Sequence, residues 1–450
     1  MQKLLYTYRK LTSGSINRKI FGAAVTVALM TMLVKVAAVF RELVVAWRFG
    51  ISDALDAFFI ALLIPSFIIS VVAESFNAAL IPTYIRVREQ EGNQAAQRLL
   101  SGTIVWSMGL LGVTTILILA TAPLYLPYLA SGFTPEKIDL TFHLLCAILP
   151  NVLLSGIIVI WSAVLNAGER FALAALSPIT TSIITIILLL MFPSWSVFSL
   201  AAGLVGGAAL EISLLGVLLR KQGISLRPKW HGFDTHMQHV AKQYVPMIAG
   251  AFLMCSTLLV DQSMAAMLLP GSVAALNYGN RLVALPINIA TQALGTAVIP
   301  YFSKMVAEQN WKGVRHTLKH YMRLIFFITV PLTVLIVIFS DLIVKIMLQR
   351  GSFTANDTYL VAQIQSFNAL QIPFYVANIL VVKLISALRA NYILMYGSLI
   401  NLTANIILNY LFMQKLGIAG IALSTSCVYM ISFSFVYCSW LRVSSKYSLS

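Results

Sequence analysis

Three basic residues stand inside long apolar stretches, where a charge is costly. Lys35 and Arg41 lie in the run 21–47, and Arg281 lies in the run 272–301. A charge at the centre of a membrane helix costs roughly 2.5–3.5 kcal/mol, and chains keep such charges mainly where they face one another or a watery cavity. Arginine grips phosphate oxygens in bidentate fashion, and lysine adds a point charge. These residues therefore predict a cationic cavity that binds a phosphate-bearing anion.

The alternative is that the charges pair between or along helices and bind no ligand. Lys35 and Glu42 are seven residues apart, on nearly the same helical face, and can pair. At about 1.5 Å per residue, the three cations lie roughly 9–18 Å below the outer surface. We favour the ligand interpretation because cations at similar depths come from both halves of the chain.

A second set of polar residues suits a small cation. Asp261 is in the middle of an apolar run, Asn405 and Asn409 are one helical turn apart, and Thr425 follows in the last apolar run. Carboxylate, amide and hydroxyl oxygens are hard ligands. Polar side chains in membrane helices more often bond across helices, so spacing alone favours that alternative.

The elements that position these residues are membrane helices. The chain has 450 residues, of which 59% are hydrophobic and 10% are charged, whereas soluble domains carry about 25% charged residues. Runs of about 20 apolar residues span the hydrocarbon core. We predict an all-α polytopic protein with twelve spans, at 21–47, 57–84, 101–123, 141–165, 172–192, 197–219, 244–268, 272–301, 321–345, 359–386, 392–413 and 418–440.

The basic residues predict the topology. Of the 31 lysines and arginines, the outer loops hold only Arg48, Lys137, Arg350 and Lys415 if the N-terminus is cytoplasmic. Positive charge collects on the inner side, so we expect both termini in the cytoplasm. The net charge of +16 then needs no nucleic-acid partner.

The chain also repeats itself. The run 79–86 resembles the run 297–304, and Gly132-Phe133-Thr134 resembles Ser352-Phe353-Thr354. We predict two parallel six-helix lobes, 1–220 and 244–450, joined by a cytoplasmic loop at 221–243. Halves of this kind commonly rock around a site at their interface.

No catalytic motif is present: the sequence has no Walker A, Gly-x-Ser-x-Gly or His-Glu-x-x-His pattern. The outer loops are short and leave little room for an active site. We therefore expect a transporter with no catalytic residues, rather than an enzyme such as a glycan ligase.

With these residues in view, the chain resembles the MurJ (MviN) family, lipid II flippases of the multidrug/oligosaccharidyl-lipid/polysaccharide exporter superfamily. The resemblance covers nearly the whole chain. It is carried by Arg41-Glu42, Phe49-Gly50, Asp56-Ala57-Phe58-Phe59, Pro65, Ala73-Glu74, Ile81-Pro82, Leu276-Asn277-Tyr278-Gly279-Asn280-Arg281-Leu282, Leu294-Gly295-Thr296 and Gly351-Ser352-Phe353-Thr354.

The resemblance implies two six-helix lobes around a central cationic cavity. It assigns diphosphate binding to Lys35, Arg41 and Arg281. It implies cavity or gating roles for Asp56, Glu74 and Asn280. It also implies a sodium site, which maps onto Asp261, Asn405, Asn409 and Thr425. No other metal or cofactor is expected.

The sequence departs from the family pattern at three points. Lipid II flippases usually carry an arginine pair on helix 2, where this chain has Ile69 and Ser70. An acidic residue usually follows the helix 8 arginine, and here the position is Ala284. Many members have fourteen helices rather than twelve.

The expected function is therefore export of a polyprenyl-diphosphate-linked saccharide across the bacterial inner membrane. Its partners would be that glycan, membrane lipids, and glycan synthases or glycosyltransferases. The departures keep a flippase of exopolysaccharide or O-antigen-type units as the alternative to lipid II. A drug/cation antiporter fits less well, because its cavity would be anionic.

Overall fold

The computed structural model describes residues 16–446 except residues 169, 225, 227, 228, 231, 298 and 389. This part of the chain is helical and contains no strand. It divides into two compact units. The first holds the described residues up to Arg48 together with Ala61–Leu126 and Ile138–Ala251, and the second holds Phe49–Ile60, Pro127–Lys137 and the residues from Phe252 onward.

The helices of the first unit are α2 (Ile16–Phe49), α4 (Ser75–Glu91), α5 (Asn93–Leu129), α6 (Pro135–Ile148), α7 (Pro150–Ala167), α8 (Phe171–Leu176), α9 (Ile179–Met191) and α10 (Phe198–Lys221). It also holds the π-helix η1 (Ile69–Glu74) and the 3-10 turn η2 (Pro193–Trp195). The division between the units runs through α3 (Asp53–Ile68) and α11 (Thr235–Ala266). It also assigns the end of α5 and the start of α6, which lie within Pro127–Lys137, to the second unit. The lobe limits 1–220, 221–243 and 244–450 remain a prediction.

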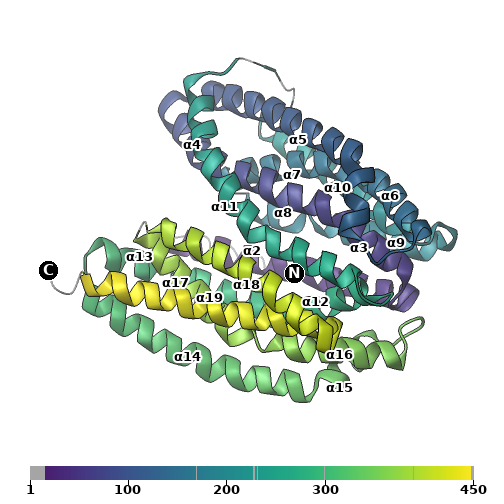
Figure 1. Ribbon diagram of the computed structural model, residues 1–450. Helices are drawn as coiled ribbons and strands as arrows, with labels where there is room; N and C mark the ends of the chain where they lie inside the picture. The colour runs from purple at the N-terminus through teal and green to yellow at the C-terminus, as the bar shows by residue number, and fades with distance from the viewer. Residues whose placement is uncertain are drawn as a thin grey trace, which may run out of the picture. The chain divides into compact units, whose positions relative to one another are not determined.

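The second unit contains α12 (Ser272–Ala297), α13 (Ile299–Ala307), α14 (Trp311–Ile338), α15 (Ser340–Leu348), α16 (Ala355–Ala369), α17 (Ile372–Ala387), α18 (Asn391–Leu416) and α19 (Ile418–Lys446). In Figure 1, α19 runs as the long yellow helix beside α18 and α17. Apolar side chains from these helices form its core, including Phe302, Val376, Leu380, Leu384 and Val436.

Ten helices or helix pairs in the described part are long and apolar enough to cross a membrane. They coincide with ten of the twelve predicted spans. The other two, 21–47 and 272–301, fall on α2 and α12, which are 34 and 26 residues long and carry the three predicted cavity cations. The count of twelve crossings remains a prediction.

The prolines act in two ways. Breaks between helices occur at Pro150, Pro178 and Pro373, because proline lacks an N–H and clashes with the preceding turn. Other prolines, such as Pro246 and Pro331, stay inside continuous helices. In a membrane, neighbouring groups satisfy the carbonyls that these prolines free.

Small residues bring α9 and α10 together in the first unit. A Cβ atom at Gly203 would lie 2.4 Å from Thr185 Oγ1, and one at Gly207 would lie 2.3 Å from Thr181 Cα. Membrane helices associate through such small residues, because lipid offers no hydrophobic drive between them.

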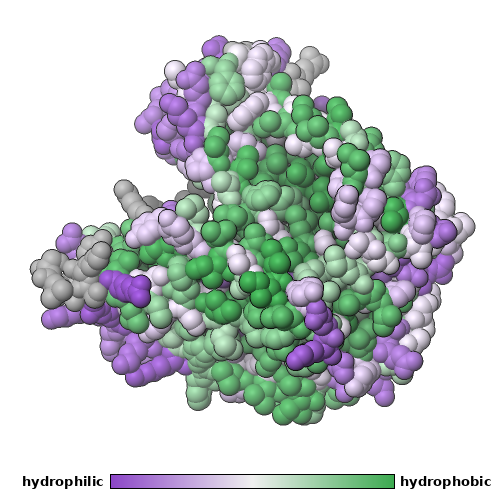
Figure 2. All heavy atoms as spheres, viewed as in Figure 1, coloured by the Kyte–Doolittle hydropathy of each residue, from purple (hydrophilic) through white to green (hydrophobic). Residues whose placement is uncertain are grey.

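The surface has the character expected in lipid. Figure 2 shows hydrophobic side chains over much of the face in view, with hydrophilic ones gathered at its margins. Large apolar side chains such as Ile116, Leu124 and Phe327 are more than two-thirds exposed. Apolar exposure on this scale marks a membrane-facing surface.

The short motifs 132–134 and 352–354 of the predicted repeat both contain a threonine that caps a helix. Thr134 Oγ1 accepts a hydrogen bond from the Lys137 N–H (3.4 Å) at the start of α6. Thr354 Oγ1 accepts one from the Asp357 N–H (3.3 Å) at the start of α16. Each threonine thus precedes a helix and satisfies an N–H group of its first turn, and the two six-helix lobes remain a prediction.

Candidate functional site

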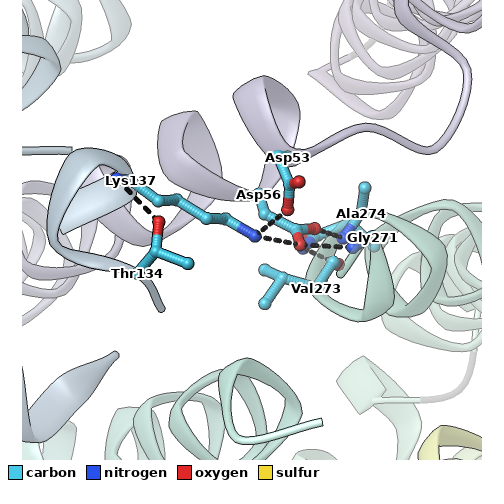
Figure 3. Close-up of polar contacts among 8 residues, drawn as sticks. Asp53, Asp56, Thr134, Lys137, Gly271, Val273 and Ala274 are labelled. Carbon is cyan, nitrogen blue, oxygen red and sulfur yellow. Dashed lines mark hydrogen bonds and ion pairs between the residues drawn. The ribbon is translucent and has the colours of Figure 1, made fainter. Parts of the chain in front are cut away.

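A buried carboxylate fastens three segments of the second unit together. Asp56, near the start of α3, is 1% exposed. Its Oδ2 atom pairs with Lys137 Nζ at 2.9 Å, and Lys137 also pairs with Asp53. Figure 3 shows the lysine reaching across to both aspartates, with the start of α12 beyond them. Lys137 Nζ also lies 3.9 Å from the centre of the Phe133 ring.

Asp56 also caps α12. It accepts hydrogen bonds from the backbone N–H groups of Gly271 (2.6 Å) and Ala274 (2.8 Å). The first N–H groups of a helix have no partner within it, and they attract a negative charge. Gly271 has a φ of +86°, and a Cβ there would lie 2.2 Å from Ile51 Cγ2, so the turn requires glycine.

The sequence predicts Asp56 as a cavity or gating residue, and the structure places it in this buried cluster. Lys137 is the member that sequence reasoning missed. It lies 81 residues from Asp56 and was counted only as an outer-loop charge. No spacing rule connects them.

Arg281 and Asn280 lie on α12 and have different surroundings. The Arg281 guanidinium carbon is 5.3 Å from the centre of the Phe59 ring. Asn280 Oδ1 accepts a hydrogen bond from Asn368 Nδ2, and Asn368 Oδ1 accepts one from Gln371 Nε2. A chain of amides thus ties α12 to α16.

Lys35 and Arg41 lie on α2 in the first unit, whereas Arg281 lies on α12 in the second unit. The Lys35 side chain is exposed. Arg41 Nη2 pairs with Glu42 Oε1 at 2.9 Å, with the side chains 23% and 16% exposed. The ion pair that the structure gives Glu42 is thus with its neighbour, whereas the sequence suggested Lys35.

Glu74 ends an irregular piece of helix. Residues Ile69–Glu74 form a π-helix between α3 and α4, and the Glu74 side chain is exposed. The Tyr244 hydroxyl donates to the Val72 carbonyl within it (3.2 Å). Short π-helical segments inside α-helices are frequently found at functional sites. This one includes Ile69 and Ser70, where the resembled family carries its arginine pair.

The four residues predicted as an ion site lie together. Asp261 Oδ1 accepts hydrogen bonds from Asn405 Nδ2 (2.9 Å) and Asn409 Nδ2 (2.7 Å). Thr425 Oγ1 is 3.5 Å from Asp261 Oδ2 and donates to the Ile421 carbonyl at 3.0 Å. Helices α11, α18 and α19 supply these side chains.

Two features of this cluster fit a monovalent cation. Asp261 is 8% exposed, and none of the ion pairs among the described residues includes it. Asn409 Oδ1 is buried with no hydrogen-bond partner. A half-turn of the amide would present that oxygen beside the carboxylate, and oxygens of these kinds are hard ligands.

Comparison with known proteins assigns the chain to a family. The family model described as lipid II flippase MurJ matches residues 45–449. A probable lipid II flippase MurJ of Synechocystis is 28% identical over 94% of this chain and 81% of its own length. Another, of Vibrio cholerae, is 25% identical over 94% of this chain and 83% of its own length.

Solved structures agree on the fold. A lipid II flippase MurJ in an inward closed conformation aligns with a TM-score of 0.80 at 23% identity, covering 94% of this chain and 90% of that one. An inward-facing multidrug resistance MATE transporter aligns with a TM-score of 0.77 at 13% identity, covering 95% and 99%. These structures confirm the predicted all-helical membrane-transporter fold. The family match confirms a transporter rather than an enzyme. The helices around Asp56, Arg281 and Asp261 are thus those of a multi-pass membrane protein that belongs to the MurJ lipid II flippase family.

Proposed function

We propose that this chain carries lipid II from the inner to the outer leaflet by alternating access. The observation that carries the proposal is the set of cations on the long helices α2 and α12 of a chain from this family. Lipid II bears a diphosphate, which must leave water to cross the bilayer. Guanidinium and ammonium groups offset that cost by charge-assisted hydrogen bonds.

Lys35, Arg41 and Arg281 are the proposed diphosphate-binding cations. Arg41 keeps donors for a ligand although Glu42 occupies one of them, because a guanidinium has five N–H groups. Glu42 lowers the net positive charge beside Arg41, which favours release of the anion after transport. Asp56, Glu74 and Asn280 keep their predicted roles in the cavity and its gating.

Sodium is the proposed coupling ion. Asp261, Asn405, Asn409 and Thr425 would hold it, and it would supply positive charge to a carboxylate that is hydrogen-bonded by neutral amides. One carboxylate with neutral oxygens fits a monovalent ion, since a second charge would stay uncompensated in a low dielectric. The ion biases transport only if the two access states differ in affinity for it.

The place of the chain in the cell follows from the same proposal. Membrane glycosyltransferases would supply the substrate at the inner face, and glycan synthases would consume it outside. Both termini would be cytoplasmic. Labelling of residues 220–242 from outside intact cells would overturn that topology.

The test is flipping in proteoliposomes with lipid II and, in parallel, a polyprenyl-diphosphate-linked O-antigen unit. We expect lipid II to be flipped, and Arg41→Gln and Arg281→Gln each to reduce its flipping about 10- to 100-fold. This corresponds to the roughly 1.5–3 kcal/mol of a charged hydrogen bond. Arg350→Gln, at an exposed outer position, is the control. Faster flipping of the O-antigen unit than of lipid II would refute the substrate assignment.

A further inference from the structure

A second group of polar side chains lies inside the unit that holds Asp261. Asn378 of α17 and Asn401 of α18 each donate a hydrogen bond from Nδ2 to Ser432 Oγ of α19, at 3.2 Å and 2.9 Å. Together these three side chains form the Asn401 cluster. We propose that the Asn401 cluster is a second and weaker cation-binding position, through which the coupling cation passes between Asp261 and the start of α18. The inference rests on the proposed sodium coupling and adds a site to it.

The Asn401 cluster holds more oxygen atoms than its own protons can satisfy. Asn378 Oδ1 and Asn401 Oδ1 are buried, and neither has a hydrogen-bond partner within the described part of the chain. Buried polar groups are normally paired, because an unpaired one has lost its bonds to water. The Ser432 hydroxyl has one proton, so it can serve only one amide oxygen even after a half-turn of an amide. At least one buried oxygen is therefore available to a ligand.

The chemistry of the Asn401 cluster suits a monovalent cation that stays only briefly. Amide and hydroxyl oxygens are hard ligands, and three helices supply them here. The cluster has no carboxylate, so the charge of a bound cation is compensated less than it is at Asp261. Weak binding is what a transit position requires, because an ion must be able to leave as well as enter.

Helix α18 connects the Asn401 cluster to Asp261. Asn401, Asn405 and Asn409 follow one another at four-residue intervals, so they lie on one face of the helix. Asn405 and Asn409 bind Asp261, whereas Asn401, nearer to the start of α18, binds Ser432. At about 1.5 Å per residue, Asn401 is roughly 6 Å along the helix from Asn405. The step between the two positions is therefore short.

Helix α19 carries a matching row of hydroxyl groups. Thr425, Tyr429 and Ser432 are at positions i, i+4 and i+7, which share one helical face. Thr425 lies at the Asp261 end of the row, and Ser432 lies at the Asn401 end. In the predicted topology the start of α18 is on the cytoplasmic side. The two polar rows therefore lead from Asp261 toward the cytoplasm.

The experiment measures the equilibrium and the rates of sodium binding to the full chain in lipid nanodiscs, by stopped-flow tryptophan fluorescence. We expect Ser432→Ala and Asn401→Leu each to slow association and dissociation about three- to tenfold, the range for loss of one neutral polar contact. The sodium affinity should stay within twofold of the parent, because the Asp261 cluster is intact. A residue that only packs the helices would not slow both rates equally.

Ser434 provides a matched control for Ser432. It lies two residues later on α19, it is exposed, and its hydroxyl donates to the Met430 carbonyl at 2.8 Å. Ser434→Ala therefore removes the same group from another face of the same helix. We expect its sodium association and dissociation rates to equal those of the parent.

A carboxylate at the second position gives a gain of binding, which a folding defect cannot imitate. Asn401→Asp should turn the transit position into a tight site, because it supplies the missing negative charge. The chain should then bind two sodium ions instead of one, counted by equilibrium dialysis with radioactive sodium. In an Asp261→Asn background, Asn401→Asp should restore the binding of one ion.

Two kinds of failure are distinguishable. Parent-like rates in Ser432→Ala and Asn401→Leu, or an unchanged ion count in Asn401→Asp, would overturn the inference. The Asn401 cluster would then only join helices, and sodium binding at Asp261 would stand. A parent that binds no sodium, or an Asp261→Asn variant that binds as much as the parent, would refute the sodium site itself and this inference with it.

Discussion

Two buried carboxylates of the second unit are compensated in opposite ways. Asp56 is 1% exposed and is bound by the Lys137 ammonium and two backbone N–H groups. Asp261 is 8% exposed and is bound by the amides of Asn405 and Asn409, with the Thr425 hydroxyl farther away. One carboxylate has a cation, whereas the partners of the other are neutral.

The difference distinguishes a cluster that holds segments of the fold together from a cluster that can bind a cation. The partners of Asp56 are a fixed cation and the first turn of α12, and they cannot turn away without disturbing that helix start. The amide partners of Asp261 can each present an oxygen in place of an N–H group by a half-turn. A mobile cation would therefore be stabilised in the Asp261 cluster, where the partners are neutral, but not in the Asp56 cluster, where Lys137 already supplies positive charge.

The largest expected effect comes from Asp56→Asn, because it removes the buried carboxylate that pairs with the buried Lys137 ammonium. Breaking one side of a buried ion pair costs about 3–5 kcal/mol. We expect a large loss of thermal stability in detergent, independent of sodium. Unfolding would be followed by intrinsic fluorescence in matched detergent with and without NaCl.

Two variants sharpen this prediction. Asp53→Asn removes the partner that is 59% exposed and should cost at most about 1 kcal/mol. Lys137→Met in the Asp56→Asn background removes the buried charge that has lost its Asp56 partner and should recover part of the loss. An Asp56→Asn variant as stable as the parent would show that Asp56 does not hold these segments together.

The second prediction concerns Asp261→Asn, which removes the charge of the other cluster but keeps its size. We expect sodium dependence of transport to be lost, while the fold and diphosphate binding at Arg281 persist. Flipping would be measured with and without sodium and with an imposed potential, since one charge crossing the membrane contributes about 2.3 kcal/mol per 100 mV. Parent-like sodium dependence would make Asp261 a helix-packing residue.

The helices and the two carboxylates could be predicted from the sequence, but Lys137 and the π-helix could not. Long apolar runs predict helices wherever the 1.5 Å rise must span a bilayer. The resemblance identified Asp56, whereas Asp261 was already a candidate because it is a carboxylate inside an apolar run. Lys137 was hidden because an ion pair across 81 residues follows from tertiary packing alone. The π-helix at Ile69–Glu74 has no composition signal, and it lies where an unbroken helix was expected.

The third prediction adds a carboxylate to the amide cluster. Asn409 is fully buried, and its Oδ1 atom has no hydrogen-bond partner. Asn409→Asp would give the site two carboxylates, which favours a divalent ion such as Ca²⁺ over sodium. We expect stabilisation by millimolar Ca²⁺ in this variant and not in the parent, read as a rise in Tm. An unchanged response to Ca²⁺ would place residue 409 outside the coordination sphere.

The smallest expected effect is that of Thr425→Val. Thr425 Oγ1 lies 3.5 Å from Asp261 Oδ2, which is too long for a strong bond, and its proton is directed to the Ile421 carbonyl at 3.0 Å. The hydroxyl therefore stabilises the Asp261 carboxylate little in the absence of a cation, yet its lone pairs remain available to a cation.

We expect the free energy of unfolding of Thr425→Val without sodium to change by less than about 1 kcal/mol, in the range of one neutral hydrogen bond. Sodium affinity should fall about threefold, measured by fluorescence titration, and Thr425→Ser should keep the parent's affinity because it keeps the oxygen. A loss of stability in sodium-free buffer as large as that of Asp56→Asn would mean that the Asp261 cluster also holds helices together. The distinction between the two carboxylates would then fail.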